Sequence, residues 1–150
     1  MKPTRDLAVL MELAQRRRDD ALQALAAVRR EQLTAQGQME QLRAYTRDAD
    51  ARWLQRASAG VTPMLLATQR QFVARLEEAI AFQTDVLQRL QERVAHAEAR
   101  VQHAERALAT LQRIQQRRQL RWLEQQRRVE QKATDEMAAA QHRRRATMMP

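Results

Sequence analysis

The sequence predicts an all-α protein: a two-helix antiparallel coiled-coil hairpin with a longer second helix. Leu, Ala, Arg, Gln and Glu dominate its 150 residues, aromatic residues make up only 3%, and there are two glycines. A compact globular domain of this length usually contains more glycine for its turns and more aromatic and β-branched residues for its core. Long amphipathic helices with few turns fit this composition better.

The only internal turn signal is the stretch "ASAGVTP" at residues 57 to 63, which contains one glycine and the only proline away from the chain ends. Gly60 suits the left-handed position just after a helix, Thr62 suits an N-cap and Pro63 suits the first turn of a helix. The sequence therefore predicts one helix over 4–59, a turn over 60–62 and a second helix over 63–145, all in a single domain.

An apolar repeat that alternates steps of four and three residues runs along both predicted helices. In the first helix 11 of 14 positions are apolar: Leu7, Met11, Ala14, Arg18, Ala21, Leu25, Val28, Gln32, Ala35, Met39, Leu42, Thr46, Ala49 and Trp53. In the second, 11 of 12 are apolar: Val73, Leu76, Ile80, Gln83, Leu87, Leu90, Val94, Ala97, Val101, Ala104, Leu108 and Leu111. A sustained seven-residue repeat is typical of a coiled coil, and the short turn makes the two helices each other's partner. Gly37 falls on the outer face.

The unequal helix lengths predict an overhang at the C-terminal end. If the turn pairs residues whose numbers sum to about 121, Thr4 lies beside Arg117, and residues 118–145 extend beyond the first helix as a single helix. We expect Leu120, Trp122 and Leu123 to be exposed there. The formal net charge is +9, and from Gln112 to Pro150 ten Lys and Arg stand against four Asp and Glu. This basicity favours an acidic partner.

The sequence offers little for catalysis. It has no cysteine, and its three histidines lack the carboxylate and histidine spacing of a metal site, so we expect no metal, no cofactor and no enzymatic activity. It contains neither a signal-peptide pattern nor an apolar run long enough to span a membrane, which favours a cytoplasmic protein. Basic stretches without a DNA-binding motif or aromatic stacking platform favour protein contact over nucleic acid.

One flank of the predicted coiled coil combines aromatic and small residues. With Met11 and Val73 at heptad position a, the g positions include Gln38 and Tyr45 on the first helix. The g positions of the second helix include Phe72, Ala79 and Val86. In an antiparallel pair these residues lie along the same side of the seam. They form a docking patch, because aromatic residues beside a rigid surface bind at low entropic cost, or they only broaden the seam.

Three segments resemble the FliJ family of the bacterial flagellar type III export apparatus. These are "QMEQLRAYTRDADARW" at 38–53, "FVARLEEA" at 72–79 and "RRVEQKATDEMAAAQHRRR" at 127–145. The more specific features are the Gln-x3-Leu-x2-Tyr and Phe-x3-Leu-x2-Ala spacings in the first two segments. The chain also resembles the family in its length, the position of its turn and its unequal helices.

The resemblance implies a stalk that links the export ATPase ring to the membrane export gate and binds free export chaperones. It places the protein in the cytoplasm, peripheral at the inner membrane through the gate. Carried over by position, the gate-binding residues are Gln38, Leu42, Tyr45, Phe72, Leu76 and Ala79. The expected contact with the ATPase ring is made by basic residues and one tryptophan of the overhang: Arg117, Arg118, Arg121, Trp122, Arg127 and Arg128.

Two positions depart from the family pattern, which has an aromatic residue at Ala49 and a histidine at Gln83. Trp53, one turn further on, is a candidate replacement for the missing aromatic residue. Leu42 and Leu76 also belong to the predicted seam, so burial in the core and exposure at a patch are both open. Two other functions stay open as well: the equivalent stalk of a virulence-type secretion system, and a basic coiled coil that binds nucleic acid.

Overall fold

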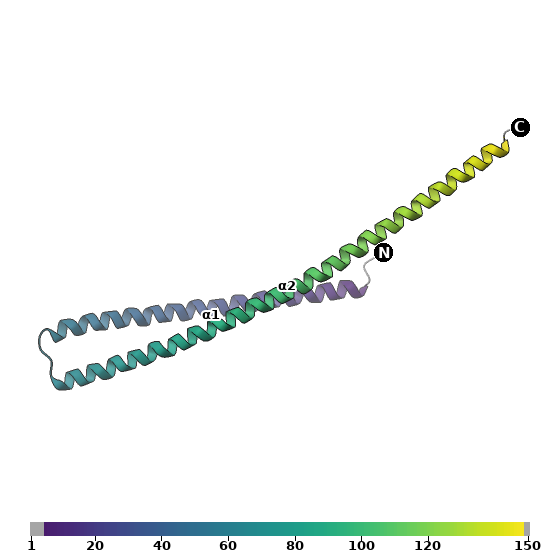
Figure 1. Cartoon of the computed structure of the whole chain (residues 1–150). Coiled ribbons are helices and arrows are strands. Elements are labelled where there is room, and N and C mark those ends of the chain that lie inside the picture. The colour runs from purple at the N-terminus through teal and green to yellow at the C-terminus, as the bar shows by residue number, and fades with distance from the viewer. Residues whose placement is uncertain (1–4, 149–150) are drawn as a thin grey trace. The chain divides into compact units, whose positions relative to one another are not determined.

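The computed structural model describes residues 5–148 and contains two α-helices (Figure 1). Helix α1 spans Arg5–Ala57 and helix α2 spans Pro63–Met148. No strand occurs among the described residues. The all-α class and the two-helix hairpin predicted from the sequence are confirmed. The predicted start of the first helix at Thr4 lies outside the described residues.

The chain divides into two compact units that share both helices. The second unit is Asp19–His103, a complete hairpin that includes the turn, and the first combines Met1–Arg18 with Ala104–Pro150. Within the hairpin unit, contacts join Tyr45 to Phe72, Gln38 to Gln83, Glu31 to Arg93 and Arg29 to Glu98. As the first number of each pair falls the second rises, so the two helices are antiparallel. The numbers in these pairs sum to between 117 and 127, on either side of the expected 121.

The predicted seam forms the core of both units. Every described position of the two apolar series is buried or half-buried, including the polar members Arg18, Gln32, Thr46 and Gln83. In the hairpin unit the buried apolar side chains are Ala21, Leu25, Ala35, Met39, Ala49, Leu76, Leu90, Ala97 and Val101. In the other unit they are Leu7, Ala14, Ala104 and Leu108. Each of these 13 residues belongs to the predicted series.

The turn contains the residues that predicted it, but it begins two residues earlier than expected, at residue 58 instead of 60. Helix α1 ends at Ala57 rather than Ala59, because the backbone N–H groups of Ala59 and Gly60 donate to carbonyls three residues back, at 3.2 Å. Gly60 has a φ of +104°, a conformation that favours glycine. The Thr62 hydroxyl accepts a hydrogen bond from the Leu65 N–H at 3.2 Å, which confirms the N-cap.

Helix α2 continues three residues beyond the expected Arg145. The hydroxyl of Thr147 donates to the carbonyls of Arg143 and Arg144, at 3.0 Å and 2.9 Å. Threonine hydroxyls inside helices commonly bond the carbonyl of the preceding turn in this way, and Thr134 does the same with the Glu130 carbonyl. Helix ends fray and carry no strong periodic signal, which is why the last residue of a helix is hard to predict from periodicity.

The two glycines should respond oppositely to alanine. A Cβ built on Gly37 meets nothing within 4 Å, and its backbone is helical, so Gly37→Ala should stabilise the protein by about 0.5–1 kcal/mol. Gly60→Ala also meets no atom, but the positive φ should make it destabilising by about 1–2 kcal/mol. Thermal unfolding of both variants measures the difference. A lower melting temperature for Gly37→Ala would contradict this expectation.

Candidate docking surface

The aromatic pair Tyr45 and Phe72 joins the two helices on the flank that the heptad positions predicted. The ring centroids are 6.2 Å apart with an interplanar angle of 69°, an edge-to-face contact. The Tyr45 side chain is 48% exposed, whereas Phe72 is half-buried. Phe72 therefore packs against one side of the Tyr45 ring and leaves about half of Tyr45 available to a partner.

The smaller apolar residues of the predicted gate-binding set lie progressively deeper. Leu42 and Ala79 are half-buried, and Leu76 is 9% exposed and belongs to the core. Ala49, where the family pattern has an aromatic residue, is also buried in the seam, and Trp53 is half-buried. Leu76 therefore acts mainly by packing between the helices, whereas Tyr45, Leu42, Phe72 and Ala79 offer surface.

Gln83 connects the outer edge of this set to the opposite helix. Its Nε2 donates to the Ala35 carbonyl at 2.9 Å and lies 3.4 Å from Oε1 of the exposed Gln38. The sequence comparison identified Gln83 only as a departure from the family pattern and missed this bond. The expected register could have indicated it, since 38 and 83 sum to 121. Gln83 orients Gln38 in place of the histidine that the family pattern has there.

An open groove continues along the same flank beyond Gln38. Its apolar part comes from Ala27, Ala35, Val86 and Leu90, and its polar part from Arg30, Glu31, Thr34, Gln38, Arg89 and Arg93. The Arg93 guanidinium bonds both oxygens of the Glu31 carboxylate, at 2.7 Å and 3.4 Å. Both side chains are more than half exposed, so the pair contributes little stability and mainly fixes the orientation of its two side chains.

Phe82 is an exposed aromatic residue beside this groove that the sequence analysis did not single out. Its side chain is 70% exposed, and it lies three residues after Ala79 and four before Val86, on one helix face. The signal for it was present in the sequence, because heptad position c adjoins position g on a helix surface. The flank therefore presents two exposed aromatic rings, Tyr45 and Phe82.

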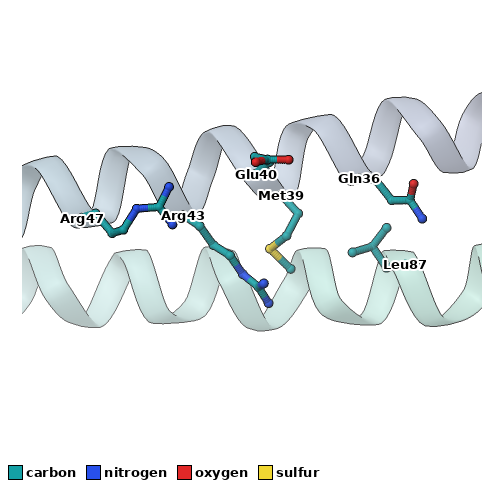
Figure 2. A pocket seen from close by; sticks show the side chains of 6 residues that line it. All are labelled: Gln36, Met39, Glu40, Arg43, Arg47 and Leu87. Atoms are coloured by element: carbon teal, nitrogen blue, oxygen red, sulfur yellow. The ribbon is translucent and has the colours of Figure 1, made fainter.

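The other flank contains a second groove (Figure 2). The side chains of Met39 and Leu87 point between the helices, while Glu40, Arg43 and Arg47 extend from α1 beside them (Figure 2). Further along the same flank, Arg29 and Glu98 form an ion pair at 3.1 Å. An ion pair between the helices therefore borders the seam on each flank, Arg29 with Glu98 on this side and Arg93 with Glu31 on the other.

The predicted contact residues for the ATPase ring lie on the C-terminal part of α2. Arg117, Arg118, Arg121, Arg127 and Arg128 are exposed, and Arg128 pairs with Glu124 at 2.8 Å within the helix. Leu120 and Leu123 are 66% and 50% exposed, as expected. Trp122 is half-buried, so the expectation that it is exposed was wrong. A bulky helical side chain lies back over the preceding turn of its own helix, which covers part of the ring.

From Leu123 to Met148 every residue of α2 is exposed. This segment contains apolar residues at unusually high exposure, including Val129 at 63% and Met137 at 67%. Its six Lys and Arg stand against four Asp and Glu, a small excess of positive charge. An exposed helix with both properties is suited to binding a partner that covers it.

These features define a class: a helical coiled-coil hairpin whose candidate sites are open side-chain surfaces along its flanks and its C-terminal helix. Within residues 5–148 no group of three His, Asp or Glu side chains is arranged to hold a metal ion, and no helix is long and apolar enough to cross a membrane. The chain belongs to the FliJ family, because the family model described as "Flagellar FliJ protein" matches residues 2–147. Comparisons with curated proteins and with solved structures gave no match.

Membership of this family gives the chain a role in the flagellar type III export apparatus and interactions with components of that apparatus. The match extends over both helices and the turn. The resemblance inferred from three short segments is therefore confirmed over almost the whole chain.

Proposed function

We propose that the protein is the stalk-like component that links the export ATPase ring to the membrane export gate and binds free export chaperones. It acts by simultaneous protein contacts in the cytoplasm, next to the inner membrane, and not by catalysis. The flank around Tyr45 and Phe72 contacts the cytoplasmic domain of the gate. The exposed part of α2 contacts the ATPase ring.

The observation that carries this proposal is the edge-to-face pair of Tyr45 and Phe72 in a chain that the FliJ family model matches from residue 2 to residue 147. The two carried-over motifs lie on different helices, 27 residues apart at these rings, and the hairpin unit brings them into contact. A half-exposed ring supported by a second ring binds with little loss of side-chain entropy. This is the property expected of a central residue in a protein interface.

The family match also weighs on the alternatives. A virulence-type stalk would share the coiled coil and the overhang, but the matching model is that of the flagellar family. A nucleic-acid-binding role is supported only by the positive charge of the chain. In the basic C-terminal part of α2, however, the apolar residues Leu120, Leu123 and Val129 are exposed among the cations. Apolar residues among the cations favour a protein surface over a phosphate backbone.

Alanine at Tyr45 tests the gate contact. Tyr45→Ala should weaken binding to the cytoplasmic domain of the gate by about 2 kcal/mol or more, because it removes a central exposed ring. Its melting temperature should change little, since half of the ring is already in solvent. Titration calorimetry with the isolated gate domain measures the affinity, and circular dichroism measures the fold.

Phe72→Ala should weaken binding to a similar extent, with a larger loss of stability because Phe72 is half-buried. Leu33→Ala is the matched control, since Leu33 is 67% exposed in the same unit and outside the set. Its affinity should equal that of the unmodified protein. Normal binding by both folded aromatic variants would remove the gate contact from this flank.

A further inference from the structure

The tip of the hairpin, defined as residues 51–70, carries charge of one sign only. Its charged residues are Arg52, Arg56 and Arg70, all exposed, and it contains no Asp or Glu. The tip contains the end of α1, the turn and the beginning of α2 (Figure 1). No ion pair among residues 5–148 neutralises Arg56 or Arg70 within the hairpin, so both cations are available to an anionic surface.

The same tip exposes an unusual amount of aliphatic surface. Met64 is 81% exposed, Leu54 71%, Leu66 40% and Val61 39%. These four are half of the eight large apolar residues that are exposed in the hairpin unit, although the tip is less than a quarter of that unit. Trp53, half-buried, lies next to them. The tip is therefore both the most apolar and a purely cationic part of the hairpin surface.

We infer that the hairpin tip docks on an anionic lipid surface, with its aliphatic side chains in the headgroup region and its arginines on the phosphates. Interfacial membrane contacts combine these two elements: apolar side chains that enter the headgroup and acyl boundary, and Lys or Arg that pair with anionic lipids. Tryptophan is enriched at the same depth. This contact differs from the proposed gate contact and does not depend on it.

The distribution of the exposed residues favours lipid over a protein groove. Leu54 lies on α1, Val61 in the turn, and Met64 and Leu66 on α2, so the apolar side chains come from three consecutive segments around a reversal of the chain. A helix that docks in a protein groove presents one stripe at spacings of three and four residues. A fluid interface can surround side chains that project from a turn.

Vesicle binding by the full-length protein tests the inference. The protein should bind vesicles of phosphatidylcholine mixed with phosphatidylglycerol, bind vesicles of phosphatidylcholine alone far more weakly, and lose binding as salt is raised. One arginine near an anionic surface corresponds to about a fivefold change in partitioning. The double variant Arg56→Gln, Arg70→Gln should therefore bind about 25-fold more weakly, while circular dichroism shows an unchanged fold.

Matched controls separate the tip from the basic C-terminal helix. Arg144→Gln with Arg145→Gln removes the same charge elsewhere and should leave vesicle binding within about threefold of the unmodified protein. Met64→Ser should weaken binding about tenfold, whereas Leu33→Ser, at a similarly exposed position outside the tip, should not. Equal losses in the two arginine pairs would overturn the inference, because binding would then be general charge attraction.

The two tryptophans, Trp53 and Trp122, report which part of the chain touches lipid. In a Trp122→Phe chain, Trp53 fluorescence should shift to the blue and be quenched by lipids brominated near the headgroup. In a Trp53→Phe chain, Trp122 should not be quenched. Quenching of Trp122 alone, or failure of the unmodified protein to bind, overturns the inference. So does a tip variant that loses affinity for the gate domain and keeps its affinity for vesicles, since the tip would then serve a protein partner.

Discussion

Leu90→Ala should lower the free energy of unfolding by about 2–5 kcal/mol. Leu90 is only 7% exposed and lies in the middle of the seam in the hairpin unit. Its effect should be large because six of the 13 buried apolar residues are alanines, which bury little surface each. The few leucines therefore supply most of the hydrophobic stabilisation, and truncation of one leaves a space that rigid helices cannot close.

Urea unfolding followed by far-UV circular dichroism measures this change. Leu33→Ala is the control, since a leucine that is 67% exposed on the outer face should change stability by no more than about 0.5 kcal/mol. If Leu90→Ala behaved like Leu33→Ala, the seam would not be the structural core. A cost for Leu90→Ala below about 1 kcal/mol would lead to that conclusion, whatever the exposure in the structure.

Periodicity was sufficient to predict the seam because a coiled coil has one dominant constraint. Any residue at an a or d position must face the other helix, whatever its neighbours are, so stepping by four and three from Leu7 reached Leu25 and Met39 correctly. The polar seam residue Gln83 obeys the same constraint, and its side-chain amide donates a hydrogen bond to the Ala35 carbonyl of the opposite helix. The register followed from the turn, since a short connection leaves little freedom for one helix to slide.

The details that the sequence did not predict depend on individual side chains. Whether Leu76 is buried and Leu42 only half-buried depends on how closely the helices approach at each level, which heptad position does not specify. The end of α1 depended on backbone bonds to carbonyls three residues back, and the half-burial of Trp122 depended on details of side-chain packing that heptad position does not specify. Phe82 is exposed because heptad position c, although it adjoins position g, points further from the opposite helix. The g positions alone therefore did not indicate it.

Deletion of residues 118–150 should abolish stimulation of the export ATPase by this protein. The deleted part of α2 carries four of the five arginines proposed for the ring contact, all but Arg117. From Leu123 to Met148 every residue of this part is exposed. Charge steers such a basic helix towards acidic or polar walls, and the exposed Leu120 and Leu123 then slow its release. Residues 1–117 retain the whole hairpin unit, so the affinity for the gate domain should be preserved.

Point variants in the full-length chain separate this contact from a general loss of charge. Arg121→Gln with Arg127→Gln should reduce stimulation strongly, whereas Arg144→Gln with Arg145→Gln should leave it near normal, because that pair lies outside the predicted contact. ATP hydrolysis at increasing protein concentration measures the effect, and a melting curve confirms that the hairpin is intact. A shortened protein that still stimulates hydrolysis would place the ATPase contact on the hairpin. Stimulation that is lost only when the hairpin itself melts would also place the ATPase contact on the hairpin. A contact made by the exposed helix alone should not depend on the seam, in which Leu25 is buried.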